Sequence, residues 1–167
     1  SGITYGVPSV GVTHGIYYNK SIFNQYNIQE PTTWGEFISA CETLLKAGIT
    51  PISLGVGDNS WVLYRVAFSC IGPNFYGGEA ARQALMSGSI SLTDSNFLDA
   101  FTALNSLKKY LPTGYETLGY EASKTLFASG GAAMFIGGSW EISVFEKLGI
   151  NSTNTGWFAS PVKTAGD

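Results

Sequence analysis

Two tryptophans occupy positions where an aromatic ring could contact a ligand. Trp61 follows the glycine-rich segment 55–60, and Trp140 follows the turn 137–139, each after a short apolar run typical of a buried strand. In open α/β sheets the carboxyl ends of the strands border the ligand crevice. We therefore predict that both indoles face one cleft, with burial of both rings in the core as the alternative.

The ligand that suits such rings is a sugar. One face of a pyranose is a flat patch of C–H groups, and covering about 80 Å² of apolar surface contributes on the order of 2 kcal/mol. The sugar hydroxyls need donors and acceptors, which neighbouring polar residues and backbone N–H groups at helix N-termini could supply. The candidate ligand-binding residues are Trp61, Trp140, Asp58, Asn59, Ser139 and Gly138.

Motifs for covalent or cofactor chemistry are incomplete in this sequence. Residues 137–141 approach a nucleophile elbow, but Glu141 stands where the second glycine must relieve the strained turn. Segment 55–60 matches half of a dinucleotide fingerprint, with serine in place of the third glycine. The single histidine, His14, leaves no material for a serine triad or a histidine-rich metal site, and we interpret it as structural. No catalytic residue, cofactor or metal is expected.

Glycoside hydrolysis is the enzymatic alternative, because it needs only an acid of raised pKa and a second carboxylate. Most acidic side chains fall on the expected outer faces of helices, where a solvated carboxylate is the ordinary interpretation. These acids are Glu36, Glu42, Asp99, Glu121 and Glu146. A domain that only binds other proteins is the third alternative.

Composition excludes several classes of partner. The 167 residues are 44% hydrophobic and 13% charged, with a formal net charge of −3 and no basic cluster. Nucleic acid and anionic lipid are therefore not expected partners. The longest apolar stretches, such as 132–136, are far shorter than the roughly 20 residues that cross a bilayer. Cys41 and Cys70 match no zinc pattern and fall in apolar helical segments, so we predict two buried thiols, with one disulfide as the alternative.

Strand and helix patterns alternate along the chain. Strands are expected at 5–8, 14–19, 51–54, 132–136 and 156–159, a tight turn at 137–138, and helices from residue 20 and at 34–47, 61–71, 80–86, 94–109, 121–128 and 139–148. Thr33 and Glu36 form a capping-box pattern before the second helix, and Trp34 belongs to its apolar stripe and is predicted as core. The position of Trp157 stays open. This alternation favours an α/β fold with a small, mostly parallel sheet covered by helices.

Five segments, in order, resemble extracellular solute-binding proteins of carbohydrate ABC transporters, of the family 1 type. The segments are YGVP at 5–8, GIYYNK at 15–20 with Phe23, PTTWGEF at 31–37, AGITPI at 47–52, and LFASG at 126–130 with AMFIGGSWE at 133–141. Each motif alone is weak, but five in register across most of the chain are specific.

The resemblance implies a receptor whose two lobes close on a ligand about a hinge. The matching segments fall in the carboxy-terminal lobe of that family. Residues 1–18 are then hinge-proximal strands, residues 19–167 form the helix-rich ligand-binding lobe, and the amino-terminal lobe is absent from this chain. The implied partners are a sugar or oligosaccharide, the ABC permease and the amino-terminal lobe, in an extracytoplasmic protein that is either periplasmic or lipid-anchored and not an enzyme.

Position within the family's motifs also implies roles for single residues. Trp61 matches the aromatic residue after the second-strand loop and Trp140 the tryptophan of the Gly-Gly-Ser-Trp turn, and both are implied to touch sugar. Asp58 and Asn59 match loop positions whose identity varies within the family. Trp34 falls in a motif that is structural there. The identity of the sugar stays open, because it depends on loop details and on the other lobe.

Overall fold

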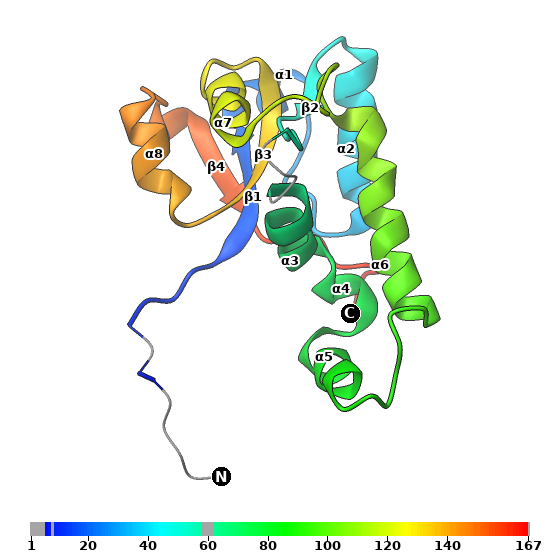
Figure 1. The fold of residues 1–167 in the computed structure, drawn as a ribbon. Coiled ribbons are helices and arrows are strands. Elements are labelled where there is room, and N and C mark those ends of the chain that lie inside the picture. The colour runs from blue at the N-terminus through cyan, green and yellow to red at the C-terminus, as the bar shows by residue number, and fades with distance from the viewer. Residues whose placement is uncertain (1–5, 8, 58–61, 167) are drawn as a thin grey trace.

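A four-stranded sheet forms the centre of the protein, in the order β2-β3-β1-β4 (Figure 1). The computed structural model describes residues 6–7, 9–57 and 62–166, with the backbone alone for 62–64. The strands are β1 (His14–Asn19), β2 (Thr50–Ile52), β3 (Ala132–Gly138) and β4 (Thr155–Phe158).

Helical segments fill the connections and cover the sheet. The α-helices are α1 (Lys20–Gln25), α2 (Trp34–Lys46), α3 (Phe68–Ile71), α4 (Pro73–Tyr76), α5 (Gly78–Met86), α6 (Ser95–Ser106), α7 (Tyr120–Ala128) and α8 (Glu141–Lys147). A π-helical stretch, η1 (Val62–Ala67), leads into α3, and two 3-10 segments are η2 (Leu107–Tyr110) and η3 (Ser152–Asn154). No helix among the described residues has the length and apolar character needed to cross a membrane.

The sheet is mixed, so the prediction of a mostly parallel sheet is wrong. β2 and β3 pair in parallel, whereas β1 pairs antiparallel with both β3 and β4. The three strands that follow helices, β2, β3 and β4, share one direction, as the alternation of strands and helices indicated. β1 lies between β3 and β4 and runs against both, and local sequence carries no signal for this placement. The α/β class and the covering helices are confirmed.

Each face of the sheet buries its own apolar cluster, because successive side chains of a strand point to opposite faces. Ile16 and Ile136 are paired across β1 and β3, and both belong to the larger cluster, which α2, α3 and α6 complete. On the opposite face Tyr17 packs with Phe127 from α7 and Phe145 from α8. Figure 1 shows this division, with α7 and α8 on the side away from α2 and α6.

The start of α2 confirms the predicted capping box. The Glu36 N–H donates to Thr33 Oγ1 at 3.3 Å, and the Glu36 carboxylate accepts from the Thr33 N–H at 3.1 Å. Trp34 is partly buried and meets the ring of Phe75 edge-on at 5.2 Å between centroids. The helix therefore begins at the predicted residue and packs Trp34 against the larger cluster, as expected.

Two local predictions differ from the structure. Residues 6–7, the described part of the expected strand 5–8, are irregular, because a strand needs a partner for its N–H and C=O groups and no described segment pairs with them. Gly137 and Gly138 do not form a turn but continue β3, paired with Gly15 and His14 of β1. The helix expected at 61–71 is described from residue 62 onward.

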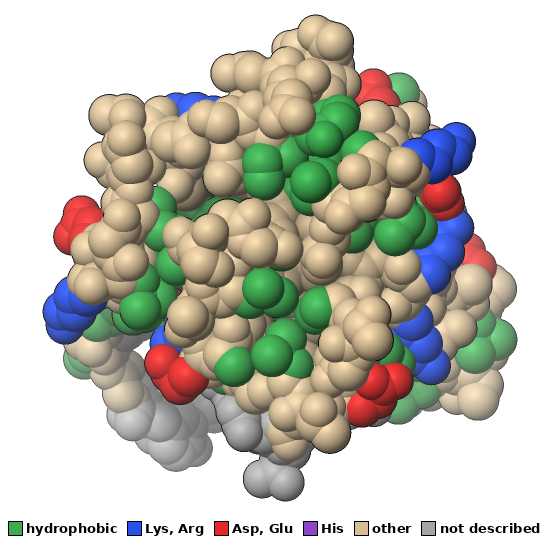
Figure 2. Space-filling view, turned by 90° about the horizontal axis from the view of Figure 1, so that it is seen from above, with side chains coloured by type: hydrophobic (Ala, Val, Ile, Leu, Met, Phe, Trp, Pro, Cys, Tyr) green, Lys and Arg blue, Asp and Glu red, His purple; other side chains and the backbone are tan. Residues whose placement is uncertain are grey.

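The surface carries no concentrated charge on the face seen from above. Figure 2 shows acidic and basic side chains interspersed around the rim of that face and apolar side chains in small separate groups. The larger exposed apolar side chains of the described residues include Met86, the last residue of α5, and Ile142 on α8.

Candidate ligand-binding site

The candidate site lies where β3 ends and α8 begins. β3 ends at Gly138 and α8 begins at Glu141, so Ser139 and Trp140 form the turn between them. Gly138 is buried, and a Cβ atom at this position would lie 2.0 Å from Cζ3 of Trp140. Glycine at position 138 therefore lets the indole lie against the end of the strand. The carbonyl oxygen of Gly138 accepts a hydrogen bond from Tyr17 Oη at 2.9 Å.

Ser139 joins this turn to the segment that enters the sheet. Its N–H donates to the carbonyl oxygen of Thr13 at 2.9 Å, and its Oγ accepts from the Thr13 N–H at 3.4 Å. His14, the first residue of β1, places its ring edge-on to Trp140 at 5.4 Å between centroids. The turn is thereby fixed at the carboxyl end of β3, the edge at which open α/β sheets bind ligands.

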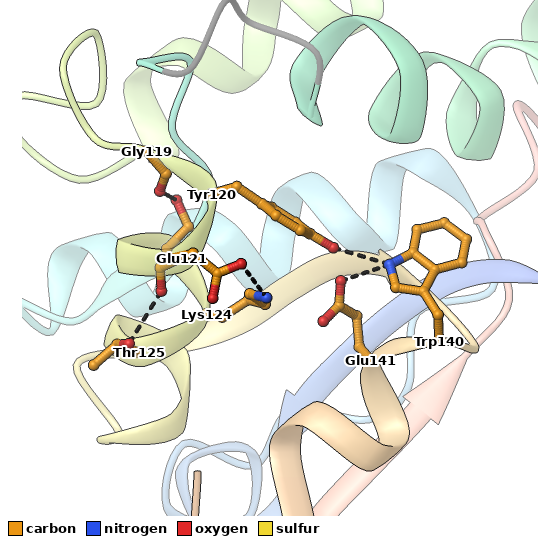
Figure 3. A network of polar contacts seen from close by, with 8 residues as sticks. Gly119, Tyr120, Glu121, Lys124, Thr125, Trp140 and Glu141 are labelled. Atoms are coloured by element: carbon orange, nitrogen blue, oxygen red, sulfur yellow. Dashed lines mark hydrogen bonds and ion pairs between the residues drawn. The ribbon is translucent and has the colours of Figure 1, made fainter. Parts of the chain in front are cut away.

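Two acceptors hold the indole of Trp140 (Figure 3). Its Nε1–H is shared between Tyr120 Oη at 2.9 Å and Glu141 Oε1 at 2.7 Å. Tyr120 begins α7 and Glu141 begins α8, so two separate helices fix one ring. The indole packs against the larger core cluster but is only partly buried. A fixed and partly exposed indole can stack on a ligand at little entropic cost.

The other candidates, Trp61, Asp58 and Asn59, lie outside the described residues. Their predicted place beside Trp140, in a cleft flanked by two indoles, stays a prediction. The segment that leads to them is described as far as residue 57.

That segment approaches the elements that hold Trp140. The Gly57 N–H donates to the carbonyl oxygen of Leu118 at 2.9 Å, and a Cβ on Gly55 would lie 2.0 Å from the same oxygen. Both glycines therefore allow close backbone approach. Leu118 precedes by two residues Tyr120, whose hydroxyl accepts from Trp140. The last described residue before position 58 is thus joined to the element that orients Trp140.

Glu141 is the least expected member of this group. Its exposed fraction is 0%, and its Oε2 has no hydrogen-bond partner among the described residues. Burial raises the pKa of this carboxyl to about 7. Burial and, secondly, the charge of Glu141 raise the pKa of Tyr17 to about 12. Sequence reasoning considered Glu141 only as the residue that breaks the nucleophile-elbow pattern, and it did not predict a buried carboxyl beside Trp140.

Lys124 supports the tyrosine that holds Trp140. Its side chain is almost fully buried, with Nζ 4.5 Å from the centroid of the Tyr120 ring and 2.6 Å from Glu121 Oε1. The negative face of an aromatic ring attracts an ammonium group placed over it, so this contact is a cation–π interaction. Tyr120 and Lys124 are four residues apart in α7, a spacing at which side chains meet on one face of a helix, but neither was singled out from the sequence.

Trp157, left open by the sequence, lies apart from this network. It is 43% exposed and lines a hollow of about 410 Å³ between α8 and β4, with Phe145 and Ser139 also on its wall. A Cβ on Gly15 would lie 2.2 Å from the Trp157 ring, so this indole rests directly on the backbone of β1. Trp157 is therefore neither a core residue nor a partner of Trp140 in the polar contacts described above.

The remaining predictions about chemical groups concern acids and thiols. Glu36, Asp99, Glu121 and Glu146 are exposed and Glu42 is partly exposed, as expected for outer faces of helices. No cluster of three or more metal-ligating side chains occurs in the described part of the chain. Cys41 and Cys70 are both free and buried, which confirms the prediction of two buried thiols.

Comparison with known proteins decides the family. The sequence model of the bacterial extracellular solute-binding proteins matches residues 1–167, which is the whole chain. The chain belongs to this family. This solute-binding chain is 25% identical over 168 residues to a multiple sugar-binding protein of Streptococcus mutans, covering 98% of the chain and 40% of that protein. It is 26% identical over 143 residues to an ABC transporter extracellular-binding protein of Pyrococcus horikoshii, covering 83% of the chain and 33% of that protein.

Solved structures agree with this assignment. The solute-binding chain matches a chitin oligosaccharide binding protein with a TM-score of 0.85 and 33% identity, over 96% of the chain and 41% of that structure. It matches the solute-binding protein RafE in complex with raffinose with a TM-score of 0.78 and 26% identity, over 93% and 41% respectively. These relatives are named as binding proteins and not as enzymes. The chain spans about two fifths or less of the length of each of these four relatives.

Proposed function

We propose that this chain is the sugar-binding lobe of the extracytoplasmic receptor of an ABC importer. The observation that carries the proposal is the indole of Trp140, which is partly exposed at the carboxyl end of β3 and held by acceptors from two helices. Such a ring offers a flat apolar surface to the C–H face of a pyranose. Relatives named for multiple sugars, chitin oligosaccharide and raffinose support a sugar or oligosaccharide as the ligand class.

The proposed site combines stacking with hydrogen bonding. Trp140 is the platform, Gly138 makes room for it, and Ser139 places a hydroxyl oxygen beside it. Trp61 supplies a second ring, with Asp58 and Asn59 as partners for sugar hydroxyls. The link from Gly57 through Leu118 to Tyr120 supports this grouping, because it joins the chain just before residue 58 to the residue that holds Trp140.

The other wall of the cleft belongs, in this proposal, to an amino-terminal lobe. Residues 1–18 carry the chain from the hinge into the lobe formed by residues 19–167. Closure of the two lobes on the sugar then creates the shape that the ABC permease reads. Since one lobe presents half a cleft and cannot close, we expect these 167 residues alone to bind sugar weakly or undetectably. Tight binding by this chain alone would contradict the two-lobed proposal.

The site is tested by replacing its platform. In a protein that contains both lobes, Trp140→Ala should weaken binding of chitin oligosaccharides or raffinose at least tenfold, measured by isothermal titration calorimetry. Trp157→Ala is the matched control, because it removes a partly exposed indole outside the Trp140 network, and its affinity should equal that of the wild type. Equal affinity of Trp140→Ala and wild type would remove Trp140 from the site.

Glycoside hydrolysis is the alternative that one observation favours, since Glu141 has the raised pKa that a general acid needs. Its full burial argues against the alternative, because an acid catalyst must reach the glycosidic oxygen. Incubation with the same oligosaccharides should release no reducing ends. Turnover that Glu141→Gln abolishes would support the enzyme instead.

A further inference from the structure

The contact between Glu141 and Trp140 places a titratable group at the nitrogen edge of the proposed sugar platform. Glu141 Oε1 accepts from the indole Nε1–H at 2.7 Å, a shorter contact than that of the same donor with Tyr120 Oη at 2.9 Å. The carboxyl is fully buried at the first position of α8. An ionised oxygen accepts a stronger hydrogen bond than a neutral one. The charge on Glu141 therefore bears on how firmly the ring is held.

The surroundings of the Glu141 carboxyl offer few groups that would stabilise a negative charge on it. Its Oε2 lacks a hydrogen-bond partner among the described residues, and a buried polar atom without a partner is rare enough to need an explanation. A Cβ on Gly137 would lie 3.3 Å from Glu141 Cγ, so the side chain lies close to the strand backbone. Such an environment favours the protonated form of the Glu141 carboxyl, and the ionised form is reached at higher pH.

The charged and titratable groups around Glu141 come from β1 and α7. Tyr17 of β1 lies near enough for the charge of Glu141 to raise its pKa, and His14 of the same strand meets the Trp140 ring edge-on. From α7, Tyr120 shares the indole N–H, and Lys124 is ion-paired with Glu121. In Figure 3 Glu121 and Lys124 lie on one side and Trp140 on the other, with Glu141 beneath the indole nitrogen.

We infer that Glu141 is a positioning residue for Trp140 and that its protonation state controls how well the platform holds a sugar. With the carboxylate ionised, the charge-assisted bond fixes the indole between Glu141 and Tyr120. With the carboxyl protonated, that bond weakens and the ring gains freedom, so stacking a sugar costs more conformational entropy. The geometry thus makes sugar affinity higher at alkaline pH than at acidic pH. The effect on sugar rests on the proposed function, whereas the effect on the indole does not.

The transition falls in an accessible range, because burial raises the pKa of Glu141 to about 7. A glutamine at this position keeps a neutral acceptor of nearly the same shape but cannot ionise. Glu141→Gln therefore separates the charge from the mere presence of a side chain. A purely structural role of Glu141 would leave the pH profile of the ring unchanged by this substitution.

The first experiment follows the ring without any sugar. In ¹H–¹⁵N spectra of this chain between pH 5 and pH 9, the indole N–H signal of Trp140, assigned with Trp140→Phe, should move with a midpoint near 7. In Glu141→Gln the movement should disappear. His14→Gln is the control for the imidazole that meets the Trp140 ring edge-on, and the movement should persist in this variant. Loss of the movement in His14→Gln, or its persistence in Glu141→Gln, would overturn the inference.

The second experiment adds the sugar, in a protein that contains both lobes. With chitobiose, chitotetraose and raffinose as probes, wild-type affinity should be at least threefold higher at pH 8.5 than at pH 5.5, and the ratio for Glu141→Gln should be near one. Sugar binding with equal ratios for both proteins would overturn the inference while leaving the proposed function. No binding of any sugar, with the indole titration intact, would overturn the proposed function and leave Glu141 as the positioning residue of Trp140.

Discussion

Replacing Glu141 with glutamine should change how the stability of the fold depends on pH. Burial raises the pKa of this carboxyl in the folded chain from the ordinary 4.5 to about 7. Between these values the folded protein holds a proton that the unfolded chain has released, so the free energy of unfolding falls as pH rises through this window. One pKa unit corresponds to about 1.4 kcal/mol, so the full loss is about 3 kcal/mol once the pH exceeds the folded-state pKa.

Urea unfolding at pH 5 and pH 8 measures this effect. Relative to Glu141→Gln, the wild type should lose about 2–3 kcal/mol of unfolding free energy between the two pH values, because glutamine has no charge to desolvate and still offers an acceptor to Trp140 Nε1. Glu146→Gln, an exposed position on the same helix, is the matched control and should change stability by less than about 0.5 kcal/mol. Identical pH dependence in wild type and Glu141→Gln would refute the reasoning.

Three further outcomes follow from described contacts. Gly138→Ala should displace the Trp140 ring, lower sugar affinity without removing the indole, and lower the free energy of unfolding in urea by about 1–3 kcal/mol. The control is Gly35→Ala, whose added Cβ would meet nothing within 4 Å and which should be neutral or slightly stabilising. Normal sugar affinity in Gly138→Ala would contradict the packing of Trp140 against the end of β3. Thr33→Ala should cost about 1 kcal/mol by removing the α2 cap, and no change would show the cap to be dispensable. Cys41 and Cys70 should resist a thiol reagent until the chain unfolds, and fast reaction of the folded protein would contradict their burial.

Local signals in the sequence predicted the elements that local chemistry determines. The capping box at Thr33 and Glu36 is such a case, because its bonds join residues three positions apart. The strand at 14–19 and the helix that begins at Lys20 are others, since Asn19 caps that helix through its own side chain. These features need no knowledge of the rest of the fold.

Features that depend on distant packing could not be predicted in this way. The antiparallel course of β1 results from its place between β3 and β4, which are separated from it by over a hundred residues. Gly137 and Gly138 read as a turn, although pairing with β1 extends the strand through both. Glu141 is buried because α7 and β1 close around it, and a glutamate at the start of a helix ordinarily predicts a solvent-exposed, dipole-stabilising position.

The most direct test of the central claim observes Trp140 while a sugar binds. In a protein that contains both lobes, the ¹H–¹⁵N signal of the Trp140 indole should shift saturably as chitotetraose or raffinose is added, with the same dissociation constant as calorimetry gives. The indole of Trp157 serves as the internal reference and should stay in place. Saturable sugar binding that leaves the Trp140 signal unmoved would contradict the assignment of this ring as the platform.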